Sequence, residues 1–295
     1  MNKNIILLLR ISCFCVLIGR AYQFIFWDAP FRTLLWDQKL IEPLINLLGY
    51  SWKEYANSLR IDSLIKLSIK LNGIFFFISA FLVLFSNNKS KNWMKTIIWL
   101  SGISLIILAL LQTKEKFYHL AMFFEHSIQF SLPFLLIYFT KTNNYLSFTW
   151  YLKTIIALTF TCHGLYAIGC IYPLPANFVT MSLNTLPLTE TQVKYFLFIA
   201  GILDFIIAIG IFIPKLYKPI LMYAIFWGSI TAIARIASGL TYDVSINIFH
   251  QYLYQTIYRV PHGIAPIILL YLTIKYSSFI SPQNNILSSD LDCNK

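Results

Sequence analysis

Eight long apolar stretches limit the fold of this chain more than any other feature of its sequence. They cover residues 5–26, 63–86, 96–112, 118–140, 150–171, 195–213, 219–237 and 260–276. A helix needs about 20 apolar residues to cross a bilayer. Backbone polar groups in hydrocarbon must be satisfied within their own segment, which favours helices. The sequence therefore predicts an all-α, polytopic transmembrane bundle of about eight helices.

The composition agrees with a membrane protein. Of the 295 residues, 58% are hydrophobic and only 12% are charged, whereas about 25% of the residues in a soluble domain are charged. The net charge of +11 is not concentrated in a basic run of the kind that binds nucleic acid. We therefore expect the lipid bilayer, and not a nucleic acid, to be the partner of the chain.

Lysines in the connecting loops indicate the orientation. Loop 87–95 carries three lysines and loop 213–218 carries two, whereas loop 172–193 has neither Lys nor Arg. Loops on the cytoplasmic side are enriched in Lys and Arg. Although Lys114 and Lys116 fall on the opposite side, the pattern predicts that both termini are cytoplasmic. The expected location is a bacterial inner membrane.

The two halves of the sequence echo one another. The matching motifs are Gly19-x2-Tyr22 with His163-x2-Tyr166, Lys66-x6-Gly73 with Lys194-x6-Gly201, and Pro133-x4-Tyr138-x-Thr140 with Pro266-x4-Tyr271-x-Thr273. They occur in the same order in each half, and internal repeats are common in membrane transport folds. We predict one four-helix unit at 1–147, a second at 148–277, and a disordered polar tail at 278–295.

Polar and ionisable side chains interrupt the apolar stretches. They are Arg20, Glu125, His126, Gln129, His163, Asp204, Arg235 and His262. Such residues are costly in hydrocarbon, so they usually face one another or a cavity. The residues could form an outer-face pocket that binds a small molecule or relays protons. They could instead be structural ion pairs, with Glu125 and Asp204 neutralising Arg20 and Arg235.

The sequence favours no metal, no haem and no familiar catalytic centre. The three histidines of the polar set are on different stretches and lack the local spacing of metal ligands. The chain also lacks a phosphate-binding glycine loop, a dinucleotide-binding glycine motif and a catalytic triad order. A protein that is not an enzyme on its own is the better interpretation.

The second half resembles the DoxX-like membrane proteins. The resemblance rests on His163-Gly-Leu-Tyr-Ala-Ile-Gly169, Pro173-Leu-Pro-x2-Phe178-x2-Met181, Ala200-Gly-Ile-Leu-Asp-Phe205 and Trp227-Gly228. It extends to the first half only through the repeat, where Arg20 stands about where the His-Gly pair would be. A weaker likeness, carried by the first helix and the histidines, is to the membrane region of the vitamin-K-dependent carboxylase group.

The DoxX-like resemblance implies a four-helix unit and a link to quinone-coupled or other redox processes. We therefore expect an accessory membrane subunit that binds a quinone or another small ligand and works with membrane or periplasmic redox subunits. Two alternatives stay open, a proton-coupled permease for small solutes and a structural or assembly protein without a ligand. Matching Gly and Pro breaks in the middle of equivalent helices, which would favour the permease, are absent from the sequence.

Overall fold

The computed structural model describes residues 3–142, 144–240 and 245–275, and all regular structure in these residues is helical. Seven helical segments are long and apolar enough to cross a membrane. The predicted all-α transmembrane bundle is thereby confirmed, and the chain is an integral membrane protein. The predicted tail at 278–295 lies outside the described residues.

Eleven of the described helices form the bundle. They are α1 (Lys3–Phe26), α5 (Leu59–Phe85), α6 (Asn92–Glu115), α7 (Leu120–Glu125), α8 (Ser127–Thr142), α9 (Tyr145–Ile168), α10 (Ala176–Thr185), α11 (Glu190–Gly210), α12 (Tyr217–Leu240), and the α13–α14 pair (Ile246–Arg259 and Pro261–Lys275). A short 3-10 turn, η1 (Pro214–Leu216), precedes α12.

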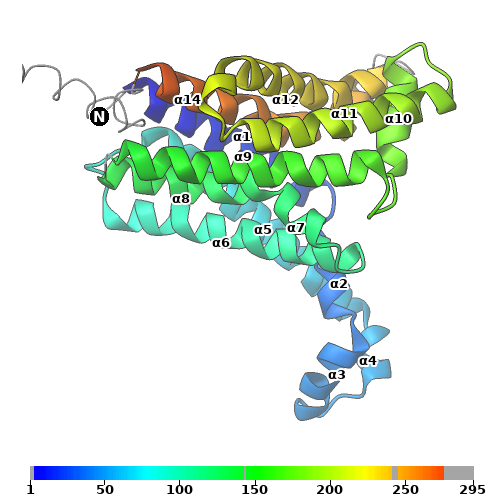
Figure 1. Ribbon diagram of the computed structural model, residues 1–295. Coiled ribbons are helices and arrows are strands. Elements are labelled where there is room, and N and C mark those ends of the chain that lie inside the picture. Colours follow the sequence, from blue (N-terminus) through cyan, green and yellow to red (C-terminus); the bar gives the residue numbers. More distant parts are fainter. Residues whose placement is uncertain (1–2, 143, 241–244, 276–295) are drawn as a thin grey trace, which may run out of the picture.

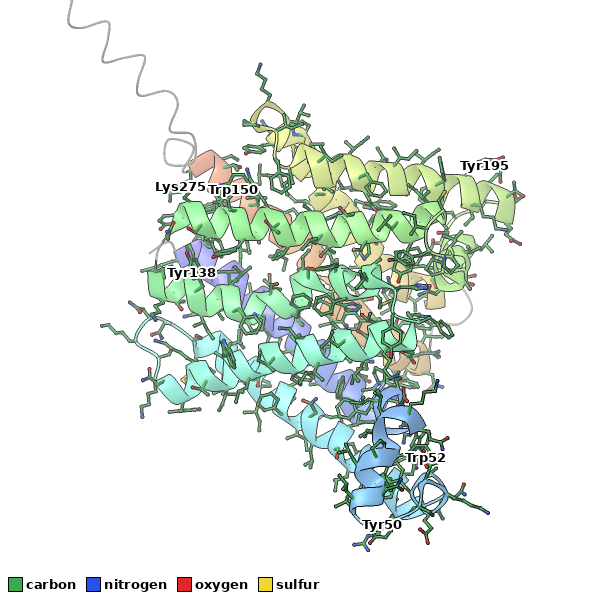
Figure 2. All side chains as sticks on the ribbon, turned by 60° about the horizontal axis from the view of Figure 1, so that its bottom comes forward. Tyr50, Trp52, Tyr138, Trp150, Tyr195 and Lys275 are labelled. Carbon is green, nitrogen blue, oxygen red and sulfur yellow. The ribbon has the colours of Figure 1, made fainter. Side chains whose placement is uncertain are left out.

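The bundle has three layers, with α1 and α9 in the middle (Figure 1). Helix α1 packs against α5, and α9 packs against α11 in the same way. The start of α1 and the end of α14 lie at the same end of the bundle (Figure 1). Tyr138, Trp150 and Lys275 mark this end, and Tyr195 marks the opposite one (Figure 2). Aromatic and cationic residues at both ends are typical of membrane interfaces.

An arm of three short helices projects from the side of the bundle (Figure 1). It comprises α2 (Arg32–Leu35), α3 (Gln38–Leu47) and α4 (Trp52–Ala56). Asp37 caps α3 by accepting from the Leu40 amide, and its carboxylate also binds the Lys114 ammonium of α6. The hydrogen bond from Lys114 lowers the pKa of Asp37 below its usual value. These contacts attach the arm to the bundle.

One predicted span is interrupted in the structure, and another begins at a break between two helices. The expected fourth span, 118–140, is divided at His126 into α7 and α8. The expected last span, 260–276, corresponds to α14 and is preceded by α13, which packs against α1 and α12 and meets α14 at Val260. Each interruption lies shortly before the proline inside the following helix, Pro133 or Pro266.

Histidine side chains bond backbone carbonyls at both interruptions. The Nδ1 atom of His126 lies 2.8 Å from the Met122 carbonyl oxygen, and Nδ1 of His262 lies 2.9 Å from that of Arg259. At Val260 the cause of the break is evident, because Pro261 has no N–H to continue the helix and suits a first helical position. At His126 neither Gly nor Pro is adjacent, which explains why the sequence did not predict a break there.

Candidate functional site

Glu125 joins the two halves of the bundle at the interruption between α7 and α8. Its Oε1 accepts a hydrogen bond from Nη2 of Arg259 at 3.1 Å and lies 3.2 Å from Nε2 of His163. Arg259 ends α13 and His163 belongs to α9, so three helices meet at one carboxylate. The carboxylate is 5% exposed, which makes this a buried ion pair with an imidazole as second partner.

His163 also stacks on His262. The two rings are 5.6 Å apart between centroids and nearly parallel, at 8°. His262 is buried, and its Nε2 has no hydrogen-bond partner among the described residues. The structure thus brings His163 and His262 together near Glu125 with Arg259, an arginine that was not among the predicted residues.

Arg20 forms a separate cluster with Gln129. Its Nη2 donates to Oε1 of Gln129 at 2.7 Å, and its Nη1 donates to Oε1 of Gln23 at 2.7 Å. The guanidinium lies over the Tyr258 ring, 3.9 Å from the centroid. The predicted pairing of Arg20 with a carboxylate is wrong: within the described residues, amide oxygens and an aromatic face surround this charge, and Glu125 pairs with Arg259 instead.

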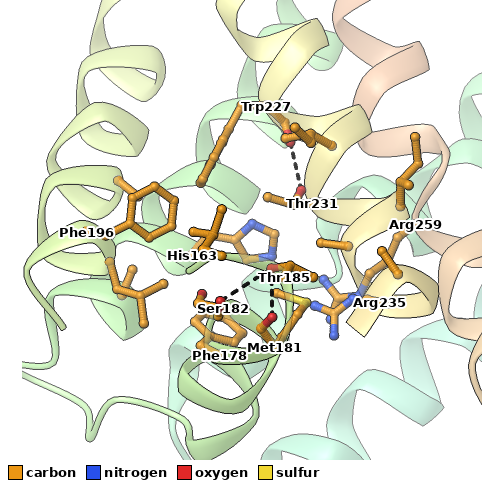
Figure 3. Close-up of a pocket in the computed structure, with 18 of the residues that line it drawn as sticks. His163, Phe178, Met181, Ser182, Thr185, Phe196, Trp227, Thr231, Arg235 and Arg259 are labelled. Carbon is orange, nitrogen blue, oxygen red and sulfur yellow. Dashed lines mark hydrogen bonds between the residues drawn. The ribbon is translucent and has the colours of Figure 1, made fainter. Parts of the chain in front are cut away.

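A first cavity of about 280 Å³ lies between α9, α10, α11, α12 and the end of α13. Its wall is mostly apolar, and its polar side chains are His163, Ser182, Thr185, Asp204, Thr231, Arg235 and Arg259. Figure 3 shows the His163 ring above the labelled residues of α10 and the Arg235 side chain beside them. The cavity is thus a small apolar chamber with polar groups from several helices.

Asp204 is the most unusual residue of this cavity. It is 3% exposed, and its Oδ1 atom has no hydrogen-bond partner among the residues that the structure describes. No ion pair with Arg235 or Arg20 is formed within those residues, contrary to the prediction. A buried polar group without a partner costs free energy. A ligand with a hydrogen-bond donor would remove that cost.

A second cavity of about 540 Å³ lies on the other side of the Glu125–Arg259 pair. Its wall comes from the end of α6, from α7, α9 and α13, and from segment 173–178. His119, Glu125, His126 and Tyr166 contribute polar side chains. Arg259 and Phe178 line both cavities, so they belong to the partition between them.

The structure divides the predicted residues among three places. His163, Asp204 and Arg235 line the first cavity, and Glu125 and His126 line the second. Arg20, Gln129 and His262 line neither. Arg259 was not among the predicted residues, because the last predicted apolar stretch begins at residue 260. Pro261, which marks a helix start two residues after Arg259, was the available signal.

In the described part of the chain, no group of three or more His, Cys, Asp or Glu side chains is arranged to hold a metal ion. In comparisons with family models, curated proteins and solved structures, the chain matches none.

Proposed function

We propose that this membrane protein binds a small amphipathic molecule in the first cavity. The observation that carries the proposal is the unpartnered Oδ1 of buried Asp204 in an otherwise apolar wall. Small-molecule sites are mostly apolar cavities of about 300 Å³ or more with a few polar groups that orient the ligand. The cavity of about 280 Å³ is close to that lower limit. It suits a ligand about the size of one substituted ring.

A quinone head group is the ligand class that we favour. Its ring is apolar, and its two oxygens lie on opposite edges. One oxygen can accept from Arg235, and in the reduced quinol form the hydroxyl at the opposite edge can donate to Asp204. The DoxX-like resemblance of the second half supports the same class, since it rests on His163 and on the segments around Asp204 and Trp227. The protein would then be an accessory subunit that works with membrane or periplasmic redox subunits.

The proposal includes a repeat of two four-helix units. Support comes from equivalent glycine contacts, because Gly73 of α5 meets Phe24 of α1 just as Gly201 of α11 meets Ile168 of α9. Both interruptions, at His126 and Val260, also fall in the last helix of a unit. The lysine distribution supports cytoplasmic termini and a bacterial inner membrane.

Filling the first cavity should abolish quinone binding. The Ala234→Leu variant places a larger side chain in the wall, and Asp204→Asn replaces the carboxyl group with an amide of the same shape. In a titration of the purified protein with a short-chain ubiquinone, followed by tryptophan fluorescence quenching, we expect saturable binding by the wild type. Ala234→Leu should show none. With the reduced ubiquinol, whose hydroxyl can donate to the carboxyl group, Asp204→Asn should bind about tenfold more weakly, the value of one hydrogen bond.

The matched control is Ala224→Leu, at a buried position of the same helix that does not line the cavity. It tests whether a larger side chain at any buried position of α12 is enough to abolish binding. Equal quenching by the wild type and by Ala234→Leu would contradict a quinone in this cavity. Absence of saturable quenching in a well-folded wild type would do the same.

A proton-coupled permease is the second candidate, favoured by the interruptions at His126 and Val260. Discontinuous helices in equivalent positions of two repeats are typical of secondary transporters, in which the site opens alternately to each side. In a background without the native cysteines, Ala234→Cys should react with a membrane-impermeant maleimide from both sides if the protein is a permease. Reaction from the outer side alone is expected for a binding subunit.

A further inference from the structure

The second cavity has its own chemistry, distinct from that of the first. Tyr166 is 3% exposed, and its hydroxyl has no partner among the described residues. Nε of Arg259 and Nδ1 of His119 are also buried without a partner there. All three atoms belong to residues that line this cavity, and a ligand that offers acceptor oxygens would satisfy such donors.

The start of α10 adds a fourth source of donors. Pro175, Ala176 and Asn177 line the cavity, and no side chain caps this helix. The first N–H groups of a helix lack partners within the helix and carry a partial positive charge. They favour an anion. The buried hydroxyl of Tyr166, a residue of the same cavity wall, is an independent feature that points to the same kind of ligand.

The carboxylates of this cavity do not exclude an anion, because each has a positive charge next to it. Glu125 is already neutralised by Arg259 and faces His163. Glu115 is exposed, as is the neighbouring Lys116, so these two opposite charges balance at the edge of the cavity. The interior therefore presents unsatisfied donors without an unpaired carboxylate to repel a negatively charged group.

We propose that the second cavity is a binding site for a small oxyanion, the carboxylate or phosphate of a solute or of a lipid head group. The anion accepts hydrogen bonds from Tyr166, from Arg259 Nε and from the first amides of α10. Since Arg259 lines both cavities, its guanidinium lies between the two sites. This site is separate from that of the proposed quinone, and it stands even if the first cavity binds a different ligand.

Inorganic phosphate is the probe that tests this site. We expect the wild type, purified in phosphatidylcholine nanodiscs, to bind phosphate saturably in a calorimetric titration at neutral pH. The Tyr166→Phe variant keeps the ring and removes only the hydroxyl, so its affinity should fall about tenfold. The matched control is Tyr172→Phe, because Tyr172 packs against Tyr166 and His119 but lines neither cavity.

The titration is repeated in nanodiscs that contain phosphatidylglycerol. Phosphate binding that persists there identifies a soluble solute as the source of the anion, and binding that is lost there identifies an anionic lipid head group. Either result, with the Tyr166→Phe effect, supports the site. An absence of saturable phosphate binding in phosphatidylcholine, or an equal affinity for wild type and Tyr166→Phe, overturns it.

Quinone titrations of the same variants separate the two sites. Tyr166→Phe should bind the short-chain ubiquinone like the wild type, because Tyr166 does not line the first cavity. Ala234→Leu should bind phosphate like the wild type, because Ala234 does not line the second. Failure of one proposal is thus visible without failure of the other.

Discussion

Replacing Glu125 with glutamine should destabilise the protein by about 3 kcal/mol, the lower end of the cost of breaking a buried ion pair. The substitution leaves Arg259, whose side chain is 12% exposed, without a compensating charge in the interior of the bundle. It also removes the carboxylate next to His163. Denaturation in a mixed-micelle titration with sodium dodecyl sulfate, monitored by circular dichroism, gives the free energy of unfolding.

A double-mutant cycle provides the control. In Glu125→Gln with Arg259→Met both charges are absent, and we expect the double variant to be more stable than either single variant. Stabilities that simply add would contradict a direct interaction between the two side chains. If the Glu125→Gln variant stays folded at neutral pH but loses phosphate or quinone binding, Glu125 belongs to a site. If binding survives in the folded fraction, the residue only holds the bundle together.

The second large effect is expected at Gly228 of α12. A Cβ atom at this position would stand 2.5 Å from the carbonyl oxygen of His262 and 2.7 Å from its carbonyl carbon. This carbonyl lies four residues before Pro266, which has no N–H to donate to it, so α14 can approach α12 closely here. Gly228→Ala must push two helix backbones apart, which should cost about 2–3 kcal/mol in the same unfolding titration.

Gly102 of α6 is the matched comparison, because an added Cβ atom there would also meet a neighbouring helix of the bundle. Its added Cβ would meet the far end of the Phe134 ring, at 2.6 Å, and no backbone atom is among its nearest neighbours. A ring can turn away where a backbone cannot. Gly102→Ala should therefore cost about 1 kcal/mol or less. Equal losses for the two variants would contradict the close contact between α12 and α14.

The apolar stretches were sufficient to predict the class of fold and most of its spans. Length and hydropathy alone locate a helix in a membrane, because the bilayer sets both. They do not predict a break such as the one at His126, which has no proline or glycine beside it and whose freed carbonyl is bonded by a side chain. That contact depends on the rotamer of one histidine, which the local sequence does not encode.

The sequence indicated which polar residues are buried, but it did not indicate which of them pair with one another. Burial of Arg20, Glu125 and Asp204 follows from their positions in apolar stretches. Their pairing depends on how each helix is rotated about its axis, and the helices carry only weak amphipathic patterns that could fix the rotation. The true partner of Glu125 came from α13, a segment whose polar character placed it outside the expected spans.

Arg259 lines both cavities, and this shared residue has a thermodynamic consequence. An anion in the second cavity that draws the Arg259 guanidinium toward itself changes the position of this positive charge in the wall of the first cavity. The two binding equilibria are then coupled, and coupling free energy is reciprocal. If bound phosphate changes the affinity for the ring ligand by some factor, the bound ring ligand must change the affinity for phosphate by the same factor. A single arginine at a helix break would thereby let the occupancy of one cavity respond to the concentration of the ligand that the other cavity binds.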